Sequence, residues 1–177
     1  RLVQACGARV VIYTRSAIAL PAGMAYEADL DRLLETVDIV SLHCPLTEQT
    51  RGLIGAAQFA RMKPGALLIN TARGPVIDET ALVDALKSGK LAGAALDTFA
   101  VEPPDPANPL FALPHAIVTP HIAAATTGAM TRMGTLAANN IICWLRGEVY
   151  DARNFLNPEI ERHGRQKLQA PAVKSRG

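Results

Sequence analysis

An arginine, a glutamate and a histidine follow three separate apolar runs of the chain, at Arg73, Glu102 and His121. Taken singly, each has an ordinary structural explanation. The arginine can pair with Asp78 on the surface, the glutamate can be a solvated loop carboxylate, and the histidine can bond to a loop carbonyl. Together they form a coherent chemical set. A guanidinium binds a carboxylate through two hydrogen bonds, and a carboxylate bonded to an imidazole fixes its tautomer and favours its protonated form. These residue types therefore predict acid/base chemistry on a substrate that carries a carboxylate.

The segments that must position these side chains alternate between two patterns. Apolar runs that predict strands occupy residues 10–13, 38–42, 66–70, 91–99 and 116–123. Apolar residues between them recur at helical spacing, as at Leu30, Leu33 and Leu34, and another helix is expected over 126–145. Asp78 is placed to cap the helix before the fourth strand. This alternation, with strands that are continuous apolar runs, predicts an α/β doubly wound parallel sheet buried on both faces.

In an open parallel sheet, ligands bind at the edge formed by the carboxyl ends of the strands. The residues that follow the five predicted strands are Thr14-Arg15-Ser16, His43-Cys44-Pro45, Thr71-Ala72-Arg73-Gly74, Asp97 with Glu102, and Thr119-Pro120-His121. The arginine, the glutamate and the histidine are therefore expected at one edge, where Gly74 lets the backbone turn. His43 is a second candidate acid, although its strand end is expected to line a cofactor.

Composition and charge restrict the class of protein. The chain has 177 residues, of which 49% are hydrophobic and 19% charged, which is ample for a packed core. The net charge is +2, so nucleic-acid binding has no electrostatic basis. No apolar run approaches the roughly 20 residues that span a bilayer, and no membrane partner is expected. Cys6, Cys44 and Cys143 show no C-x-x-C pairing, so we expect reduced thiols in the cytoplasm, with no disulfide and no metal site.

Three longer motifs resemble one family. "LHCPLTEQTRGLI", "MKPGALLINTARGPVIDETALVDALKSGKLAGAALDTFAVEPP" and "NPLFALPHAIVTPHIAAAT" are similar to the cofactor domain of the D-isomer-specific 2-hydroxyacid dehydrogenases. That family includes phosphoglycerate, glyoxylate/hydroxypyruvate and D-lactate dehydrogenases. The resemblance extends from about Val10 to about Pro158. It implies a Rossmann-type fold and hydride transfer between a nicotinamide cofactor and C2 of a small 2-oxo or 2-hydroxy acid.

The resemblance also implies roles for single residues. Arg73 would hold the carboxylate and keto oxygen of the substrate, while Glu102 and His121 would form the acid/base pair. Asp97 would meet the nicotinamide side of the cofactor. The residues expected to contact the cofactor are Thr14, Arg15, Ser16, His43, Cys44, Pro45, Thr71, Ala72, Asp97, His121 and Ala123.

The beginning of the chain departs from the family pattern. The family's G-x-G-x-x-G turn and the strand before it do not occur in the sequence. We therefore expect a cofactor domain over 1–147 that is incomplete at its N-terminus, a C-terminal segment of the substrate domain over 148–162, and a disordered polar tail over 163–177. Since that turn cradles the cofactor pyrophosphate, the chain alone is predicted to turn over negligibly.

A second departure concerns the choice of cofactor. NAD-dependent members carry an acidic residue after the second strand of the cofactor domain, whereas Thr14, Arg15 and Ser16 follow the corresponding strand here. A carboxylate repels a 2′-phosphate, and a guanidinium flanked by hydroxyls accepts one. The alternative is that Arg15 is a solvent-facing loop charge. The cofactor is thus expected to be NADP or NAD, with NADP favoured. Ala123 and Ala124 stand where the family often has glycines, which would narrow the pocket near the nicotinamide.

Other functions fit part of this pattern. A non-catalytic dinucleotide sensor of the corepressor type shares the fold and often these residues. Formate and alanine dehydrogenases are related, but formate oxidation pairs the histidine with a glutamine rather than with a glutamate such as Glu102. By the family resemblance a homodimer is expected, and the apolar segment 108–118 would suit its interface.

Overall fold

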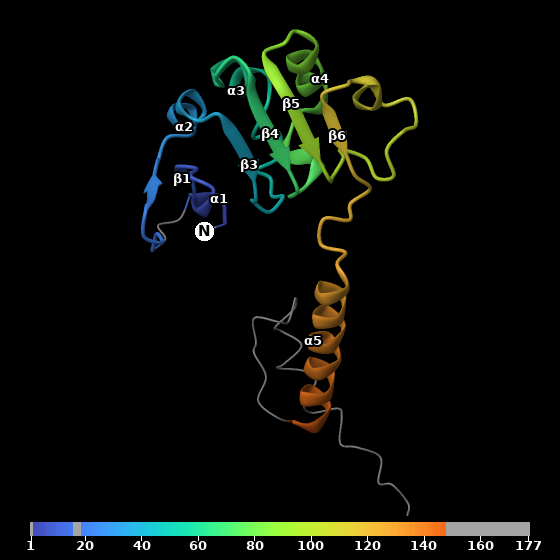
Figure 1. Ribbon diagram of the computed structural model, residues 1–177. Coiled ribbons are helices and arrows are strands. Elements are labelled where there is room, and N and C mark those ends of the chain that lie inside the picture. Colours follow the sequence, from blue (N-terminus) through green and yellow to red (C-terminus); the bar gives the residue numbers. More distant parts are fainter. Residues whose placement is uncertain (1, 16–18, 148–177) are drawn as a thin grey trace, which may run out of the picture. The chain divides into compact units, whose positions relative to one another are not determined.

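The structure is a computed structural model that describes residues 2–15 and 19–147 (Figure 1). The chain divides into two compact units, Arg1–Ala123 and Ala124–Gly177. Ser16 and the two C-terminal segments expected over 148–162 and 163–177 lie outside the described residues. The predicted domain boundary at 147 therefore stays a prediction, whereas the compact units divide between residues 123 and 124.

The first unit contains two sheets, and every strand pair in them is parallel. In the smaller sheet β1 (Val10–Ile12) pairs with β2 (Met24–Tyr26). The larger sheet has the order β3 (Ile39–Leu42), β4 (Ala66–Asn70), β5 (Leu91–Leu96) and β6 (Ala116–Val118). Its last residues are in register, because Leu42 pairs with Asn70, Asn70 with Leu96, and Leu96 with Val118. The expected parallel α/β sheet is confirmed, and four of the predicted strands end at one edge.

Short helices accompany the strands. α1 (Leu2–Ala5) precedes β1, whereas α2 (Leu30–Thr36), α3 (Ala56–Arg61) and α4 (Glu79–Lys87) connect successive strands, with 3-10 turns at Gly74–Val76 and Pro109–Ala112. The starts of α2 and α4 are fixed by side-chain caps, since Asp29 accepts from two backbone N–H groups of α2 and Asp78 accepts from Ala81 N–H. The predicted cap at Asp78 is confirmed.

The core of the first unit lies between these helices and one face of the larger sheet. Leu34 of α2, Phe59 of α3 and Leu82 of α4 are buried together with strand residues such as Leu68 and Leu96. Burying apolar side chains of this size from both layers is the main source of stability for such a unit.

The opposite face of the larger sheet is more open within the first unit. Ile39, Leu67 and Ile117 are 55%, 40% and 69% exposed, and β3 alternates between exposed and buried residues. The expectation of burial on both faces is thus met on one face only. Apolar runs identify these strands, but the run alone does not say which layer covers each face.

Strand β2 was not predicted from the sequence. It has three residues, Met24–Tyr26, of which one is half-buried and two are exposed, and so short an apolar stretch does not by itself predict a strand. Its position depends on pairing with β1 in register from Val10↔Met24 to Ile12↔Tyr26. Pairing with a distant strand is a tertiary property that local pattern does not carry.

The described part of the second unit consists mainly of α5 (Thr127–Arg146). The helix begins at the Thr126 cap, which accepts from Ala129 N–H, and ends at Gly147 in the left-handed conformation with φ 67°. The predicted helix over 126–145 is confirmed to within a residue at each end.

Among the described residues, no helix combines the length and apolar character needed to cross a membrane.

Candidate active site

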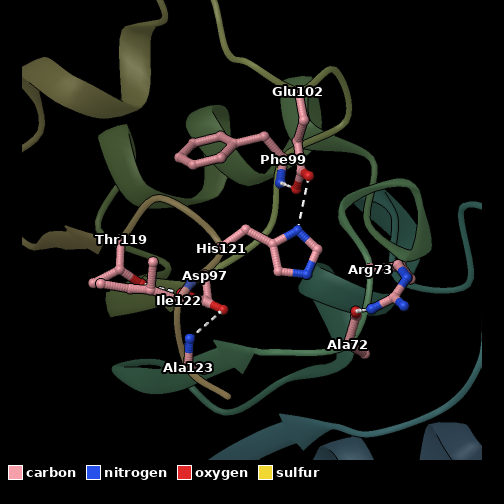
Figure 2. A network of polar contacts seen from close by, with 9 residues as sticks. All are labelled: Ala72, Arg73, Asp97, Phe99, Glu102, Thr119, His121, Ile122 and Ala123. Atoms are coloured by element: carbon pink, nitrogen blue, oxygen red, sulfur yellow. Dashed lines mark hydrogen bonds and ion pairs between the residues drawn. The ribbon is translucent and has the colours of Figure 1, made fainter. Parts of the chain in front are cut away.

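The histidine and the glutamate form a hydrogen-bonded pair at the strand-end edge. His121 Nδ1 lies 2.8 Å from Glu102 Oε2 (Figure 2). The other carboxylate oxygen, Oε1, accepts from Phe99 N–H at 3.0 Å. The hydrogen bond from His121 and then the one from Phe99 hold the pKa of Glu102 below its usual range, with a smaller contribution from the charge of Arg73. Glu102 is therefore ionised at neutral pH and holds one imidazole nitrogen.

The second imidazole nitrogen is available for chemistry. Within the described residues, His121 Nε2 has no hydrogen-bond partner, and the side chain is 45% exposed. A carboxylate on Nδ1 stabilises the proton on that nitrogen and leaves Nε2 to exchange a proton with a ligand. This is the arrangement of a general acid or base.

The loop that carries His121 is held by the buried carboxylate of Asp97. Asp97 Oδ1 accepts from the Thr119 hydroxyl at 2.6 Å and from Ile122 N–H at 2.8 Å, while Oδ2 accepts from Ala123 N–H at 2.9 Å (Figure 2). Burial raises the pKa of Asp97, but these three hydrogen bonds outweigh it, so the pKa lies below its usual range. His121 itself has φ 56°, a left-handed backbone that a non-glycine residue adopts only when its surroundings enforce it.

These contacts change the interpretation of Asp97. From the sequence it was expected to meet the nicotinamide side of a cofactor. In the structure its side chain is 4% exposed and binds its own chain. Direct contact with a cofactor stays a prediction, while support of the histidine loop is observed.

Arg73 lies on the loop after β4, where Asn70 shapes the backbone. The fully buried Asn70 accepts from Ala72 N–H at 3.0 Å and donates from Nδ2 to the Arg73 carbonyl at 3.0 Å. Arg73 donates one guanidinium N–H to the Ala72 carbonyl at 2.6 Å. Asp78 is occupied as the cap of α4, and the described part of the chain contains no ion pair of Arg73. The guanidinium is therefore exposed with most of its donors free.

Gly74 brings the arginine loop against the loop that carries Glu102. A Cβ built on Gly74 would lie 1.9 Å from both the carbonyl carbon and oxygen of Phe99 and 2.5 Å from Ala100 N. Gly74 was expected to permit a turn. Its φ lies outside the left-handed region, so the glycine is required by the close approach of two backbones.

Two polar residues that the sequence did not single out lie beside the Glu102 loop. The Glu79 carboxylate accepts from Ala100 N–H at 3.0 Å and from Asn108 Nδ2 at 2.6 Å. The only signal in the sequence is that Glu79 follows a residue, Asp78, that already caps the helix. A second acid at a helix start is common on electrostatic grounds alone, so its partners were not predictable.

The remaining expected contacts lie at other strand ends. His43 is exposed, and its Nε2 is 2.9 Å from Ser41 Oγ. Cys44 is half-buried, as is Thr14, whereas Pro45 and Thr71 are exposed and Ala72 is buried. No hydrogen bond joins His43 to the Glu102–His121 pair within the described residues.

The loop after β1 is tied to the loop after β3. Arg15 donates from its guanidinium to Gln49 Oε1 at 2.8 Å, and Thr14 accepts from the Tyr26 hydroxyl through its carbonyl at 3.1 Å. Arg15 is thus exposed, positively charged and paired with a neutral amide.

Among residues 2–15 and 19–147, no three His, Cys, Asp or Glu side chains come together as metal ligands.

Comparison with known proteins identifies the family of this domain. Residues 1–123 match the family profile described as D-isomer specific 2-hydroxyacid dehydrogenase, NAD binding domain. The chain is 52% identical over 132 residues to a glyoxylate reductase from Thermofilum pendens, covering 75% of this chain and 38% of that protein. It is 48% identical over 132 residues to glyoxylate/hydroxypyruvate reductase B from Citrobacter koseri, covering 75% and 40%.

A solved structure shows the same fold. The D-isomer specific 2-hydroxyacid dehydrogenase from Lactobacillus delbrueckii ssp. bulgaricus, in its NAD complexed form, has a TM-score of 0.79 at 33% identity, covering 84% of this chain and 49% of that one. The chain spans less than half the length of each of these relatives.

Proposed function

The chain belongs to the D-isomer specific 2-hydroxyacid dehydrogenase family, through its NAD binding domain, and on that premise we propose that it carries the catalytic residues of a reductase for small 2-oxo acids. The observation that supports this most strongly is the Glu102–His121 pair at 2.8 Å, with His121 Nε2 unpartnered in the described part of the chain. Glyoxylate or hydroxypyruvate is the substrate class, as in the names of the relatives.

A nicotinamide cofactor fits the edge where four parallel strands end in register, since exposed side chains such as His43, Thr71 and His121 stand there. When bound, the reduced nicotinamide would provide the hydride that C2 of the 2-oxo acid accepts. His121 Nε2 gives its proton to the keto oxygen, which receives the electron pair of the carbonyl bond, so that a 2-hydroxy acid forms. The ionised Glu102 stabilises the protonated imidazole before transfer. In the reverse direction His121 takes the hydroxyl proton.

Arg73 is the residue that we assign to substrate binding. Its exposed guanidinium uses one N–H on the Ala72 carbonyl, and the remaining donors match a carboxylate in a bidentate geometry. The same positive charge makes a small contribution to the low pKa of Glu102, which supports assigning the arginine to the same site. Orientation of the substrate and polarisation of its keto group follow from this position.

We further infer that the cofactor is NADP(H) in preference to NAD(H). Arg15 follows β1, and its side chain is held by the neutral Gln49 amide, so its charge is not cancelled by a carboxylate. A 2′-phosphate would supply the missing anion. The measurement is kcat/KM for NADPH and for NADH in a full-length protein that contains this chain. We expect NADPH to be favoured, and Arg15→Ala to reduce kcat/KM for NADPH about ten-fold while changing the value for NADH little. Equal use of the two cofactors would refute the inference.

A homodimer in the cytoplasm completes the proposal. The apolar residues Phe111 and Ile117 are 43% and 69% exposed and would suit an interface. Cys6, Cys44 and Cys143 are free thiols, which accords with a reducing compartment.

The His121→Ala variant tests the catalytic assignment in the same full-length protein. Removing a general acid lowers the rate by about 10²- to 10⁴-fold, so we expect kcat for glyoxylate or hydroxypyruvate reduction to fall by that factor while dinucleotide binding persists. His115→Ala is the matched control, because His115 is also an exposed histidine but lies directly before β6, at the opposite end of that strand from His121. Unchanged turnover in His121→Ala would reject the assignment. Dinucleotide binding without any turnover in the unaltered protein would favour a sensor.

A further inference from the structure

Glu79 lies at the first position of α4, but its side chain does not serve that helix. The cap is already formed by Asp78, whose Oδ1 accepts from Ala81 N–H at 3.1 Å. The half-buried Glu79 carboxylate instead accepts from two groups of a different segment, Ala100 N–H through Oε2 at 3.0 Å and Asn108 Nδ2 through Oε1 at 2.6 Å.

These two partners lie on either side of Glu102 in the chain. Ala100 precedes the glutamate by two residues and Asn108 follows it by six. Asn108 is itself fixed, since its Oδ1 accepts from Leu110 N–H at 2.9 Å and Leu110 is fully buried. One carboxylate on α4 therefore closes both ends of the loop that carries the catalytic carboxylate.

These contacts converge on the backbone of Phe99 and Ala100, in two successive peptide units. Phe99 N–H, in the first unit, donates to Glu102. In the second unit Ala100 N–H donates to Glu79, and the Phe99 carbonyl faces the backbone of Gly74, where no Cβ can fit. The contact with Glu79 therefore fixes the peptide unit that follows the one bonded to Glu102 and packs against the arginine loop.

From this arrangement we propose that Glu79 is a positioning residue of the active site, which holds the 99–108 loop so that Glu102 stays on His121 Nδ1. We call the two hydrogen bonds from Ala100 and Asn108 to Glu79 the brace. The catalytic consequence rests on the function proposed above, whereas the brace does not. Hydrogen bonds to a charged acceptor are strong enough that the loss of two of them should raise the fraction of molecules with a released 99–108 loop by about ten-fold or more. The loop then samples positions in which Glu102 does not reach the imidazole.

The test uses Glu79→Ala and Glu79→Gln in a full-length protein that contains this chain, with two readouts. The first is hydrogen exchange of the Ala100 amide followed by NMR, which needs no substrate. The second is the pH profile of kcat/KM for reduction. We expect exchange at Ala100 to become about ten-fold faster and the pH profile to move, because Glu102 then holds His121 Nδ1 in only part of the molecules.

Two matched variants separate the brace from a general effect of charge on α4. Asp84→Ala removes an exposed acid from the same helix, and no hydrogen bond or ion pair of that side chain occurs among the described residues. Both readouts should stay as in the unaltered protein. Glu79→Ala combined with Thr80→Glu returns an acid to the first turn without rebuilding the brace, and should behave like Glu79→Ala alone.

The possible results test the brace, the positioning role and the proposed function separately. Unchanged exchange at Ala100 in both Glu79 variants would overturn the brace. Faster exchange with an unmoved pH profile would overturn the positioning role, and so would recovery of the profile by Thr80→Glu. If the unaltered protein reduces no 2-oxo acid, the proposed function fails, and the exchange comparison alone upholds or overturns the brace.

Discussion

Single residues in this site are held mainly by carboxylates that accept from backbone N–H groups. Glu102 accepts from Phe99 and Glu79 from Ala100, while Asp97 accepts from Ile122 and also from Ala123. Each acid therefore fixes a loop rather than another side chain alone. Charge-assisted hydrogen bonds of this kind are stronger than neutral ones, which explains how exposed loops keep His121 in a left-handed conformation.

Asp97→Asn is expected to lower the free energy of unfolding by about 2 kcal/mol at pH 7, because one buried N–H would face an amide N–H. The folded-state pKa of Asp97 is depressed. Its ionised form therefore stabilises the fold above the ordinary aspartate range, near pH 4, and that stabilisation is lost as pH falls through the lower folded value. The difference between variant and unaltered protein should thus shrink below pH 4.

Urea unfolding at several pH values measures that difference, with Asp84→Asn as an exposed control expected to change stability by less than about 0.5 kcal/mol. A difference between Asp97→Asn and the unaltered protein that stays constant from pH 7 to pH 3 would contradict the assignment of stability to the ionised carboxylate.

At the scale of elements, the larger sheet brings the three catalytic candidates together. Its strands end in register at Leu42, Asn70, Leu96 and Val118, so the loops after β4, β5 and β6 emerge side by side. Backbone packing then refines their positions, since the arginine loop touches the Glu102 loop at Gly74. The site is thus produced by a parallel sheet and adjusted by the contact between two of its loops.

Gly74→Ala should destabilise the fold by about 3 kcal/mol, because a methyl group cannot be placed against the Phe99 carbonyl without moving a backbone. The proposed reductase activity should fall with it, since both Arg73 and Glu102 lie next to this contact. Thermal and urea unfolding report the loss of stability. Gly55→Ala is the matched control, because a Cβ there meets atoms at 3.8 Å or more and an exchange at this helix start costs about 1 kcal/mol or less. Similar effects of the two substitutions would contradict the close-approach explanation.

At the scale of the whole molecule, the chain contains the proposed acid/base pair, whereas one glycine-rich motif that binds dinucleotides is absent from its sequence. No G-x-G-x-x-G occurs in its 177 residues, and β1 and β2 form a sheet separate from β3–β6. The matched segment covers 38%, 40% and 49% of the three relatives named above. We therefore expect the 177-residue chain to carry the proposed acid/base residues but to bind the cofactor weakly.

We predict that the 177-residue chain by itself oxidises NADPH or NADH negligibly in the presence of glyoxylate. The physical reason is that backbone N–H groups at a glycine-rich helix start bind the cofactor pyrophosphate, and this motif is missing from the sequence. Absorbance at the reduced nicotinamide band measures the rate, with a full-length protein containing this chain as the positive control. Robust turnover by the short chain would show that its other contacts suffice.

Local features of the sequence were enough to predict much of the fold and the members of the candidate site. Strand β4 has the bounds that its apolar run indicates, Asp78 caps the helix that follows, and the Glu102–His121 contact was anticipated from residue type and strand-end position. Apolar runs, helix caps and strand ends act over a few residues, so they can be recognised without a structure.

Only the tertiary structure decided how the site is supported. The pairing of β2 with β1, the backbone approach at Gly74, the hold of Asp97 on the histidine loop and the brace from Glu79 to Asn108 were not apparent in the sequence. Asp97 and Ala123 are 26 residues apart, and Glu79 and Asn108 are 29 apart. A short polar side chain selects such a partner only after the sheet has brought the two segments to hydrogen-bonding distance, so its role is a consequence of folding and not of local pattern.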